Sequence, residues 1–400
     1  MDTSRVPVIV GAARTPIGRY LGALSSLTAP QLGGIAIREA VERSGVSPDL
    51  IKEVIMGNVL QGGVGQAPAR QAMLAAGLPA SISAVTVNKV CGSGLKSVML
   101  AAQAIRAGDA DAIVAGGMES MSNAPHYVYG YRGGVKFGDQ QLVDGMIRDG
   151  LWCATCNVHM GSHAEYTAKK AHVTRDRQDE FAAESHRRAI AAQEAGKFRA
   201  EIVCVEIPGK KGPTLVDADE GPRRDTTAQS LAGLKPAFGA KGEADLTVTA
   251  GNASTLNDGA AALVVVSEAF AKEHGLDILA RIDSYATGAV EPRELFFAPI
   301  RAVGNLLARE HSKITDFDLI EANEAFASQS IADGDALGWD PKRVNVNGGA
   351  IALGHPIGAS GARVLVTLLY ALADRGGRRG LATLCLGGGD AVAMSITRNN

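Results

Sequence analysis

The chain has 400 residues, of which 46% are apolar and 20% are charged, and its net charge is only −2. This composition is typical of a globular protein, and it excludes a disordered chain and a protein that attracts nucleic acid through a global positive field. No stretch approaches the roughly 18 consecutive apolar residues of a membrane span. We therefore expect neither nucleic acid nor a membrane as a partner, and an anionic ligand would have to be met by local Lys or Arg side chains.

The first predicted element is a strand at residues 6–13. This apolar run is flanked by single arginines and is too short for a secretory signal peptide. The last residues, 397–400, carry no peroxisomal or retention address. The chain has five cysteines, an odd number without a secretory signal, which favours reduced thiols. A cytoplasmic location is the resulting expectation.

An approximate internal duplication divides the chain. Each copy has a β-branched strand, a glycine turn, a small-residue helix and a second strand that ends in glycines. The first strands are predicted at 85–88 and 344–347, and the second strands at 112–115 and 381–386. Strands that alternate with helices predict βαβ units in largely parallel sheets. Two such halves would form a layered α/β body with pseudo-twofold symmetry.

The amino-acid composition changes between the halves, at residues 122–251. Aromatic residues and glycines there precede a charged helical stretch at 174–196. We expect an inserted loop domain here, and a charged helix of this kind is usually a solvated face. The N-terminal half would then comprise residues 1–121 and 252–271, and the C-terminal half residues 272–400.

Cys91 follows a predicted strand and precedes a helix, where free backbone N–H groups and the helix dipole favour a thiolate. The glycines at 92 and 94 would let a substrate approach closely. A small buried cysteine that fills a core position explains the same residue equally well.

His355 stands between Gly354 and Pro356, which fix the backbone without bulk and suit a side chain at the wall of a cleft. Cys385 ends a strand beside three glycines, whose N–H groups could form an anion nest. When they are considered one at a time, His355 and Cys385 are also explained as ordinary residues of the core or the surface.

Cys153 and Cys156 form a C-x-x-C pair, with His159 three residues later. A structural zinc site needs four ligands and no second pair is present, so we expect no metal. The preferred interpretation is that Cys153 and Cys156 are free thiols without a function of their own, which the protein tolerates near the acyl pocket.

Read together, the segments around Cys91, His355 and Cys385 resemble the thiolase family, and the resemblance covers nearly the whole chain. Further matching segments lie at 13–18, 116–122, 159–161, 251–254, 257–260 and 323–326. The resemblance implies a thiolase-like α/β fold, with two pseudo-symmetric halves in an αβαβα arrangement and the inserted loop domain. It also implies a coenzyme-A-dependent acyltransferase.

The resemblance implies that His355 takes the proton of Cys91, whose thiolate attacks an acyl-CoA to form an acyl-enzyme. Cys385 would act as acid and base at the α-carbon of the second acyl-CoA, for which a thiol with an ordinary pKa of about 8.5 is suited. One oxyanion site would be formed by the N–H groups of Cys91 and Gly387, and the other by His355 and a water held by Asn323. An exposed helix cap is the alternative for Asn323.

For coenzyme A, the matching positions are Arg223 and Ser230 near the nucleotide, and Ser254, His159 and Met160 along the pantetheine. A charged side chain that simply faces solvent explains Arg223 almost as well as a contact with coenzyme A does. Coenzyme A thioesters would be substrates, and no permanently bound cofactor is expected. The family also implies a homo-oligomer, usually a tetramer built from two tight dimers.

Two positions depart from the family pattern. Asp390 follows the last glycines, where it could raise the pKa of Cys385 by like-charge repulsion or could face solvent. Thr255 occupies a position that is usually Gly, near the expected pantetheine. Neither change removes a proposed catalytic atom.

Segments 122–125, 133–136, 144–146 and 149–151 resemble the branch that condenses two acetyl-CoA molecules to acetoacetyl-CoA, the acetyl-CoA C-acetyltransferases. Met160 would narrow the acyl pocket. A degradative 3-ketoacyl-CoA thiolase of broader chain length is the main alternative. A decarboxylating ketoacyl synthase is disfavoured by Cys385. A non-catalytic acyl-binding or lipid-binding protein would be expected to lack one of the reactive groups.

Overall fold

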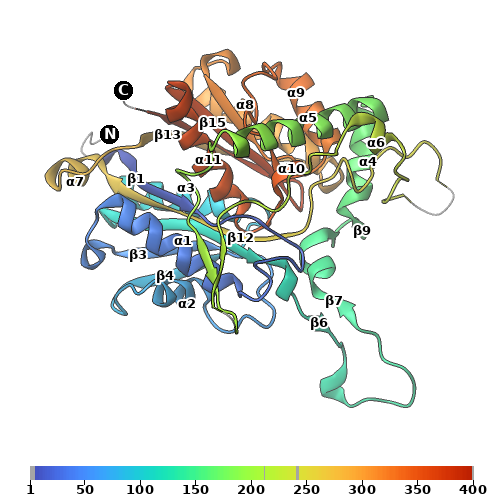
Figure 1. The fold of residues 1–400 in the computed structure, drawn as a ribbon, viewed down its shortest axis with the longest axis horizontal. Helices are drawn as coiled ribbons and strands as arrows, with labels where there is room; N and C mark the ends of the chain where they lie inside the picture. Colours follow the sequence, from blue (N-terminus) through green and yellow to red (C-terminus); the bar gives the residue numbers. More distant parts are fainter. Residues whose placement is uncertain (1–4, 211, 240–242, 399–400) are drawn as a thin grey trace.

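The computed structural model describes residues 5–210, 212–239 and 243–398, and these residues contain one mixed sheet of ten strands (Figure 1). Asn399 and Asn400, at the end of the segment without a sorting address, lie outside the described residues. The strands of this sheet are β1 (Pro7–Arg14), β2 (Gly18–Arg19), β3 (Glu53–Gly57), β4 (Ser83–Val87), β5 (Ala112–Ser120), β12 (Asn257–Ser267), β13 (Ala280–Ala289), β14 (Leu319–Ala322), β15 (Arg379–Leu386) and β16 (Asp390–Thr397).

The sheet order is β14-β15-β16-β13-β1-β12-β5-β3-β4, with β2 beside β12. Within the sheet, the strands of the two halves are joined by two residue pairs between β1 and β13. Pairing is parallel only for β3 with β4 and β5 and for β14 with β15, so the expectation of largely parallel sheets is wrong. In the C-terminal half, one antiparallel pair follows directly from the chain. Strands β15 and β16 are joined by a three-glycine turn that permits only an antiparallel hairpin.

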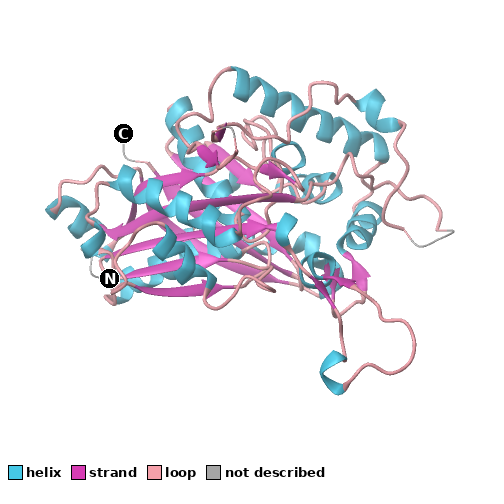
Figure 2. Cartoon of the chain, turned by 60° about the horizontal axis from the view of Figure 1, so that its bottom comes forward, coloured by secondary structure: helices cyan, strands magenta, loops and turns pink. Residues whose placement is uncertain are grey.

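Helices lie between the strand layers of the two halves and on both outer faces (Figure 2). The helices are α1 (Ala29–Ser44), α2 (Pro68–Ala75), α3 (Ser93–Ala107), α4 (Met160–Lys170), α5 (Arg175–Glu194), α6 (Ala228–Ala232), α7 (Glu268–Glu273), α8 (Ala298–Glu310), α9 (Ala327–Leu337), α10 (Ala350–Leu353) and α11 (Ser360–Arg375).

Three apolar clusters hold these layers together. The central cluster joins α3 and α11 to strands of both halves, so this helix pair forms the middle layer. A second cluster packs α1 and α2 on the N-terminal strands, and a third packs α8 on the C-terminal strands. The five layers therefore follow the order αβαβα, and the expected fold is confirmed.

Most of the predicted elements are found where the sequence placed them. The strand expected at 6–13 is β1, and the helix expected at 174–196 is α5. The strand expected at 344–347 is wrong, because only Val344 makes a bridge, to Ile320, and Asn345 has a positive φ of 46°. The side chain of Asn345 instead bonds the backbone of Ala322 in both directions.

Residues 122–251 carry α4, α5 and α6. Within this segment Val205 and Val216 pack into the apolar cluster of α1, α2 and the N-terminal strands. The segment also contains the short strands β6 (His126–Tyr127), β7 (Val143–Asp144), β8 (Trp152–Cys153), β9 (Val158–His159), β10 (Val205–Ile207) and β11 (Thr214–Val216). Helix α5 is not a simple solvated face, because Gln178, Asp179 and His186 on it are buried.

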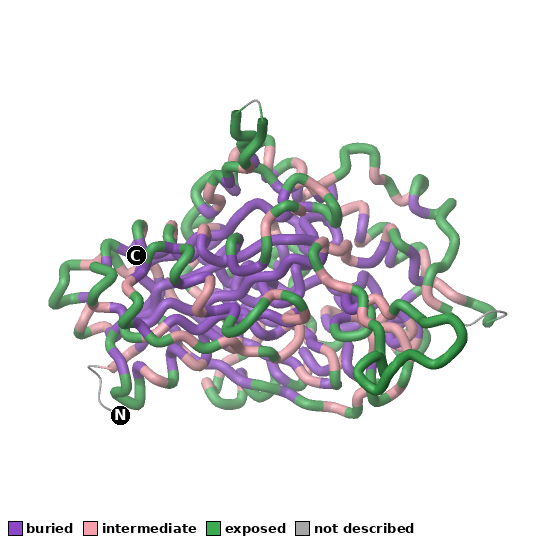
Figure 3. Tube along the Cα trace, turned by 90° about the horizontal axis from the view of Figure 1, so that it is seen from below, coloured by how far each residue is buried: buried purple, intermediate pink, exposed green. Residues whose placement is uncertain are grey.

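A projecting arm, residues 128–142, extends from this region and is exposed along its whole length (Figures 1 and 3). None of the helices in the described part of the chain is long and apolar enough to cross a membrane.

Arg14, at the end of β1, ties the loop segment to the sheet. Its fully buried guanidinium donates to Glu201 at 2.7 Å and to both oxygens of Asp219 at 2.7 and 2.9 Å. Its backbone N–H donates to Glu201 O, and its carbonyl accepts from Val203. Removing one partner of a buried ion pair leaves an uncompensated charge, so this contact is costly to break.

We therefore expect Arg14→Met to lower the free energy of unfolding by about 3–5 kcal/mol, measured by urea denaturation. Arg187→Met is the matched control, because the side chain of Arg187 is 68% exposed in its pair with Glu184. Exposed pairs contribute about 0–1 kcal/mol, so equal losses in both variants would contradict the assignment.

Candidate active site

A cavity of about 530 Å³ opens where the two halves meet residues 122–251. Cys91, His355, Cys385 and Gly387, which are far apart in the sequence, all line it. Cys91 comes from the turn between β4 and α3, His355 from the loop between α10 and α11, and Cys385 from the end of β15. The candidate residues of the three motifs therefore meet at one place.

The turn that carries Cys91 is strained. Val90 has φ 46°, a left-handed conformation that is unfavourable for a β-branched residue. Ser93 holds the turn, because its Oγ accepts from the Lys89 N–H at 2.8 Å and donates to the Val90 carbonyl at 2.6 Å. A sharp strand-to-helix turn of this kind presents a nucleophile to a cavity.

Burial dominates the electrostatics of Cys91. It raises the pKa of the Cys91 thiol to about 12, although hydrogen bonds from the backbone N–H groups of Cys91 and Gly387 act in the opposite direction. The N–H groups act in favour of the thiolate, as expected at the helix start, but burial has the larger effect. Their convergence on the sulfur marks a place where negative charge is stabilised.

The backbone of the His355 loop is fixed by Asn257. Its Oδ1 accepts from the His355 N–H at 2.9 Å, and its Nδ2 donates to Gly18 O. Gly354 is required here, because its φ is +112° and a Cβ atom would lie 2.4 Å from the Asn257 side chain.

The hydrogen bonds of Ser360 select the tautomer of His355. Ser360 Oγ donates to Pro356 O at 2.9 Å, so it accepts from His355 Nδ1–H at 2.6 Å. Nε2 is then the unprotonated nitrogen, and Asn323 Nδ2 lies 3.5 Å from it. Burial lowers the pKa of His355 to about 3, which keeps the imidazole neutral and able to accept a proton near pH 7.

Asn323 lies just after β14 and is 1% exposed, so the interpretation as an exposed helix cap is wrong. Its Oδ1 has no hydrogen-bond partner among the described residues. That oxygen is free to accept a hydrogen bond from a water molecule.

Cys385 is 2% exposed and packs among apolar residues that include Phe296 and Phe326. Burial, and then the nearby Cys91, raise its pKa. The carboxylate of Asp333 raises it further, whereas Asp390 is not among the causes of the shift and pairs with Lys89. Both explanations suggested for Asp390, repulsion of Cys385 and simple exposure, are replaced by this ion pair.

Most of the residues expected along coenzyme A also line the cavity, namely His159, Met160, Arg223 and Ser254. His159 stacks on Phe238 with a centroid separation of 5.1 Å, and its Nδ1 accepts from the Gly161 N–H. Ser230 is not part of the cavity lining, and its side chain caps α6.

Sequence reasoning missed several positioning residues. Ser360 orients His355, Asn257 fixes its backbone, and the buried carboxylate of Glu119 accepts from the N–H groups of Val59, Leu60 and Gly358. Glu119 and Asn257 do lie in segments recognised as family motifs, but the backbone groups that their side chains bond here are 59 to 239 residues away in the chain. Arg19, on the cavity wall beside Arg223, carried no signal in the sequence.

Two family models match the chain, thiolase, N-terminal domain, over residues 7–269 and thiolase, C-terminal domain, over residues 276–398. The chain belongs to the thiolase family. An acetyl-CoA acetyltransferase of Cupriavidus necator is 55% identical, over 98% of this chain and 99% of the relative. Proteins of the same name from Pseudomonas aeruginosa and Escherichia coli are each 54% identical, also over 98% of this thiolase and 99% of the relative. The resemblance drawn from the motifs is confirmed.

The raised pKa of Cys91 predicts slow alkylation of this thiol at neutral pH. Only the thiolate reacts, so the rate of Cys91 modification by iodoacetamide should keep rising between about pH 7 and pH 10. Peptide mass spectrometry measures it, with Cys91→Ser as the control for the other thiols. A rate that is already constant from pH 6 upward would contradict the assignment.

Ser360→Ala should lower kcat/KM for thiolysis of a 3-ketoacyl-CoA by about 10- to 100-fold, because His355 loses the bond that fixes its tautomer. Ser360→Thr keeps the hydroxyl and should retain most of the activity. Unfolding curves of both variants test for a purely structural effect. If Ser360→Ala matched the wild type in kcat/KM, the positioning role would be excluded.

Proposed function

We propose that this thiolase catalyses the reversible Claisen condensation of two acetyl-CoA molecules to acetoacetyl-CoA and CoA, through an acyl-Cys91 intermediate. The observation that carries the proposal is the convergence of Cys91, His355 and Cys385 on one cavity, with two N–H groups aimed at the Cys91 sulfur. The printed names of relatives at 54–55% identity support the same reaction.

In the first half-reaction, Nε2 of His355 accepts the Cys91 proton while the sulfur attacks the thioester carbonyl. Proton transfer to a neutral base during attack suits a thiol whose pKa burial has raised. The developing oxyanion takes the place between the N–H groups of Cys91 and Gly387. The acyl–CoA bond then breaks, and the leaving CoA thiolate takes the proton of Cys385, so the step leaves Cys385 as a thiolate and His355 protonated at Nε2.

In the second half-reaction, Cys385 acts as the base that removes an α-proton from the second acetyl-CoA. Its burial makes the thiolate strongly basic once it forms. The Nε2–H of the protonated His355 and a water on Asn323 Oδ1 stabilise the enolate oxygen of the attacking thioester. The carbanion attacks the acyl-Cys91 carbonyl, so a carbon–carbon bond forms while the bond to Cys91 sulfur breaks, and the released Cys91 thiolate takes the proton back from His355.

Substrate binding follows from the rest of the cavity. Met160 and other apolar side chains, among them Met121, Leu151 and Ile357, surround the acyl site and favour a short chain. The exposed arginines Arg19 and Arg223 lie at the cavity wall, where they can meet the phosphates of coenzyme A. Ser230 remains a predicted nucleotide contact on the neighbouring helix α6.

We also propose a homotetramer and a cytoplasmic location. The projecting arm exposes six large apolar side chains, which is typical of an assembly surface: Val128, Tyr129, Tyr131, Val135, Phe137 and Leu142. Strand β4 forms one edge of the sheet and exposes Val85, so it offers a second surface for a partner subunit. The five cysteines are all free thiols, as a reducing compartment favours.

The test is CoA-dependent loss of the acetoacetyl-CoA enolate absorbance, repeated with longer 3-ketoacyl-CoA substrates. We expect C4 cleavage by the wild type and a loss of at least about a thousandfold in both Cys91→Ser and Cys385→Ser. Cys204→Ser, which changes an exposed thiol outside the cavity, is the control and should keep its activity.

Faster cleavage of long chains than of acetoacetyl-CoA would assign the protein to the degradative branch. If no substrate were cleaved and mass spectrometry found no acetyl group on Cys91, the non-catalytic alternative would replace the proposal.

A further inference from the structure

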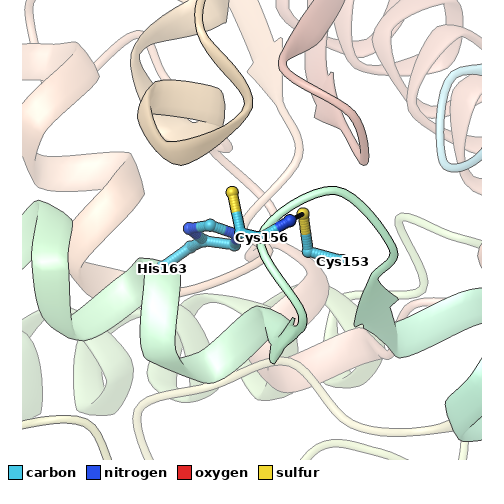
Figure 4. Close-up of side chains that lie close together, drawn as sticks. All are labelled: Cys153, Cys156 and His163. Atoms are coloured by element: carbon cyan, nitrogen blue, oxygen red, sulfur yellow. Dashed lines mark hydrogen bonds between the residues drawn. The ribbon is translucent and has the colours of Figure 1, made fainter.

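Cys153, Cys156 and His163 form a second cluster of reactive side chains outside the cavity of the catalytic residues (Figure 4). The cysteines lie at the end of β8 and in the turn before β9, and His163 lies in the first turn of α4. The two sulfurs and a ring nitrogen are all within 4.8 Å of one another. The sequence pointed to His159 as the neighbour of this pair, but His159 stacks on Phe238 and is not part of the cluster.

A second observation at the same place also points to a ligand. His163 is 2% exposed, and its Nε2 has no hydrogen-bond partner within the described residues. Buried side-chain nitrogens are seldom left without a partner.

The donors are of the type that zinc prefers. Two cysteine sulfurs and one imidazole are soft or borderline ligands, which select zinc over magnesium or calcium. The Cys156 N–H donates to Cys153 Sγ at 3.3 Å and so stabilises a thiolate there. Two thiolates and a neutral imidazole carry a charge of −2, which balances a divalent cation.

The cluster is accessible to an ion and to water. Cys156 and His163 line a cavity of about 790 Å³ that is separate from the catalytic one. Its other polar lining residues include Glu165 and Arg293. A fourth coordination position can therefore be filled by solvent, which completes the tetrahedral geometry of zinc.

We propose that Cys153, Cys156 and His163 bind one Zn²⁺ ion, with water as the fourth ligand. The ion links the hairpin at 152–159 to α4. His159 and Met160, at the junction of these two elements, line the catalytic cavity, so the site stabilises one wall of that cavity. This proposal revises the expectation that the chain holds no metal and does not depend on the proposed reaction.

The test uses full-length protein purified under reductant, stripped of metal with a chelator and titrated with Zn²⁺ and with Co²⁺. We expect one equivalent of either ion per chain and, with Co²⁺, the charge-transfer absorption of thiolate ligands. Cys156→Ser and His163→Thr should each raise the apparent Kd at least about 100-fold, because they remove a direct ligand. Cys204→Ser and Cys91→Ser should leave the Kd unchanged, and circular dichroism of the metal-free variants checks their folding.

Substoichiometric binding to the folded wild type, or full binding by both ligand variants, would overturn the proposal. Loss of binding in Cys91→Ser would overturn it as well, because it would place the ion at the catalytic thiols. A Cys153–Cys156 disulfide that mass spectrometry detects in protein purified without reductant, with no metal bound, would replace the zinc site by a redox pair. Activity is not the readout, so failure of this proposal is distinguishable from failure of the proposed function.

Discussion

The close approach of glycine-containing segments from the two halves is the constraint on which the site depends. A Cβ atom on Gly94 would lie 2.6 Å from the Ala362 backbone nitrogen, and one on Gly117 would lie 2.1 Å from Gly358 O. A Cβ on Gly92 would meet Leu386 at 2.4 Å. These contacts bring the turn of Cys91, the loop of His355 and the strand end of Cys385 together. A side chain at Gly94 or Gly117 would meet backbone atoms of the other half and force the two halves apart, whereas at Gly92 it would displace the end of the Leu386 side chain.

The same close packing sets the chemistry. Burial keeps His355 neutral and keeps both thiols protonated, so no member of the site carries a permanent charge. Negative charge arises only during the reaction, and fixed backbone N–H groups and the Asn323 side chain then stabilise it. The hydrogen bonds that His355 donates to Ser360 and Asn257 hold the imidazole in one tautomer and one place, and Ser93 holds the strained turn at Val90.

Residues 122–251 are integrated into the body rather than attached to it. Arg14 fixes residues 201 and 219 against β1, and Asp179 on α5 accepts from Asn252 at 2.9 Å. The segment thereby supplies one wall of the catalytic cavity through His159 and Met160. The Cys153, Cys156 and His163 cluster lies directly behind that wall, so a bound ion would reinforce the most irregular part of the chain.

The sequence by itself determined the family and the layered α/β class, and it predicted Cys91, His355 and Cys385 as the central site residues, because the glycine turns beside them are local patterns. It failed at 344–347, where a β-branched pattern was overridden by the left-handed Asn345, and in the direction of strand pairing, which depends on where distant strands return to the sheet.

Only the tertiary structure decided which side chains serve these residues. Asn257 and Glu119 act through partners far away in the chain that no local pattern identifies, and the bond of Ser360 to His355, five residues before it, depends on how the loop folds. His163 rather than His159 meets the C-x-x-C pair. The physical reason is that burial and hydrogen-bond geometry are properties of the packed chain, whereas spacing in the sequence constrains only neighbours along a turn, a strand or a helix.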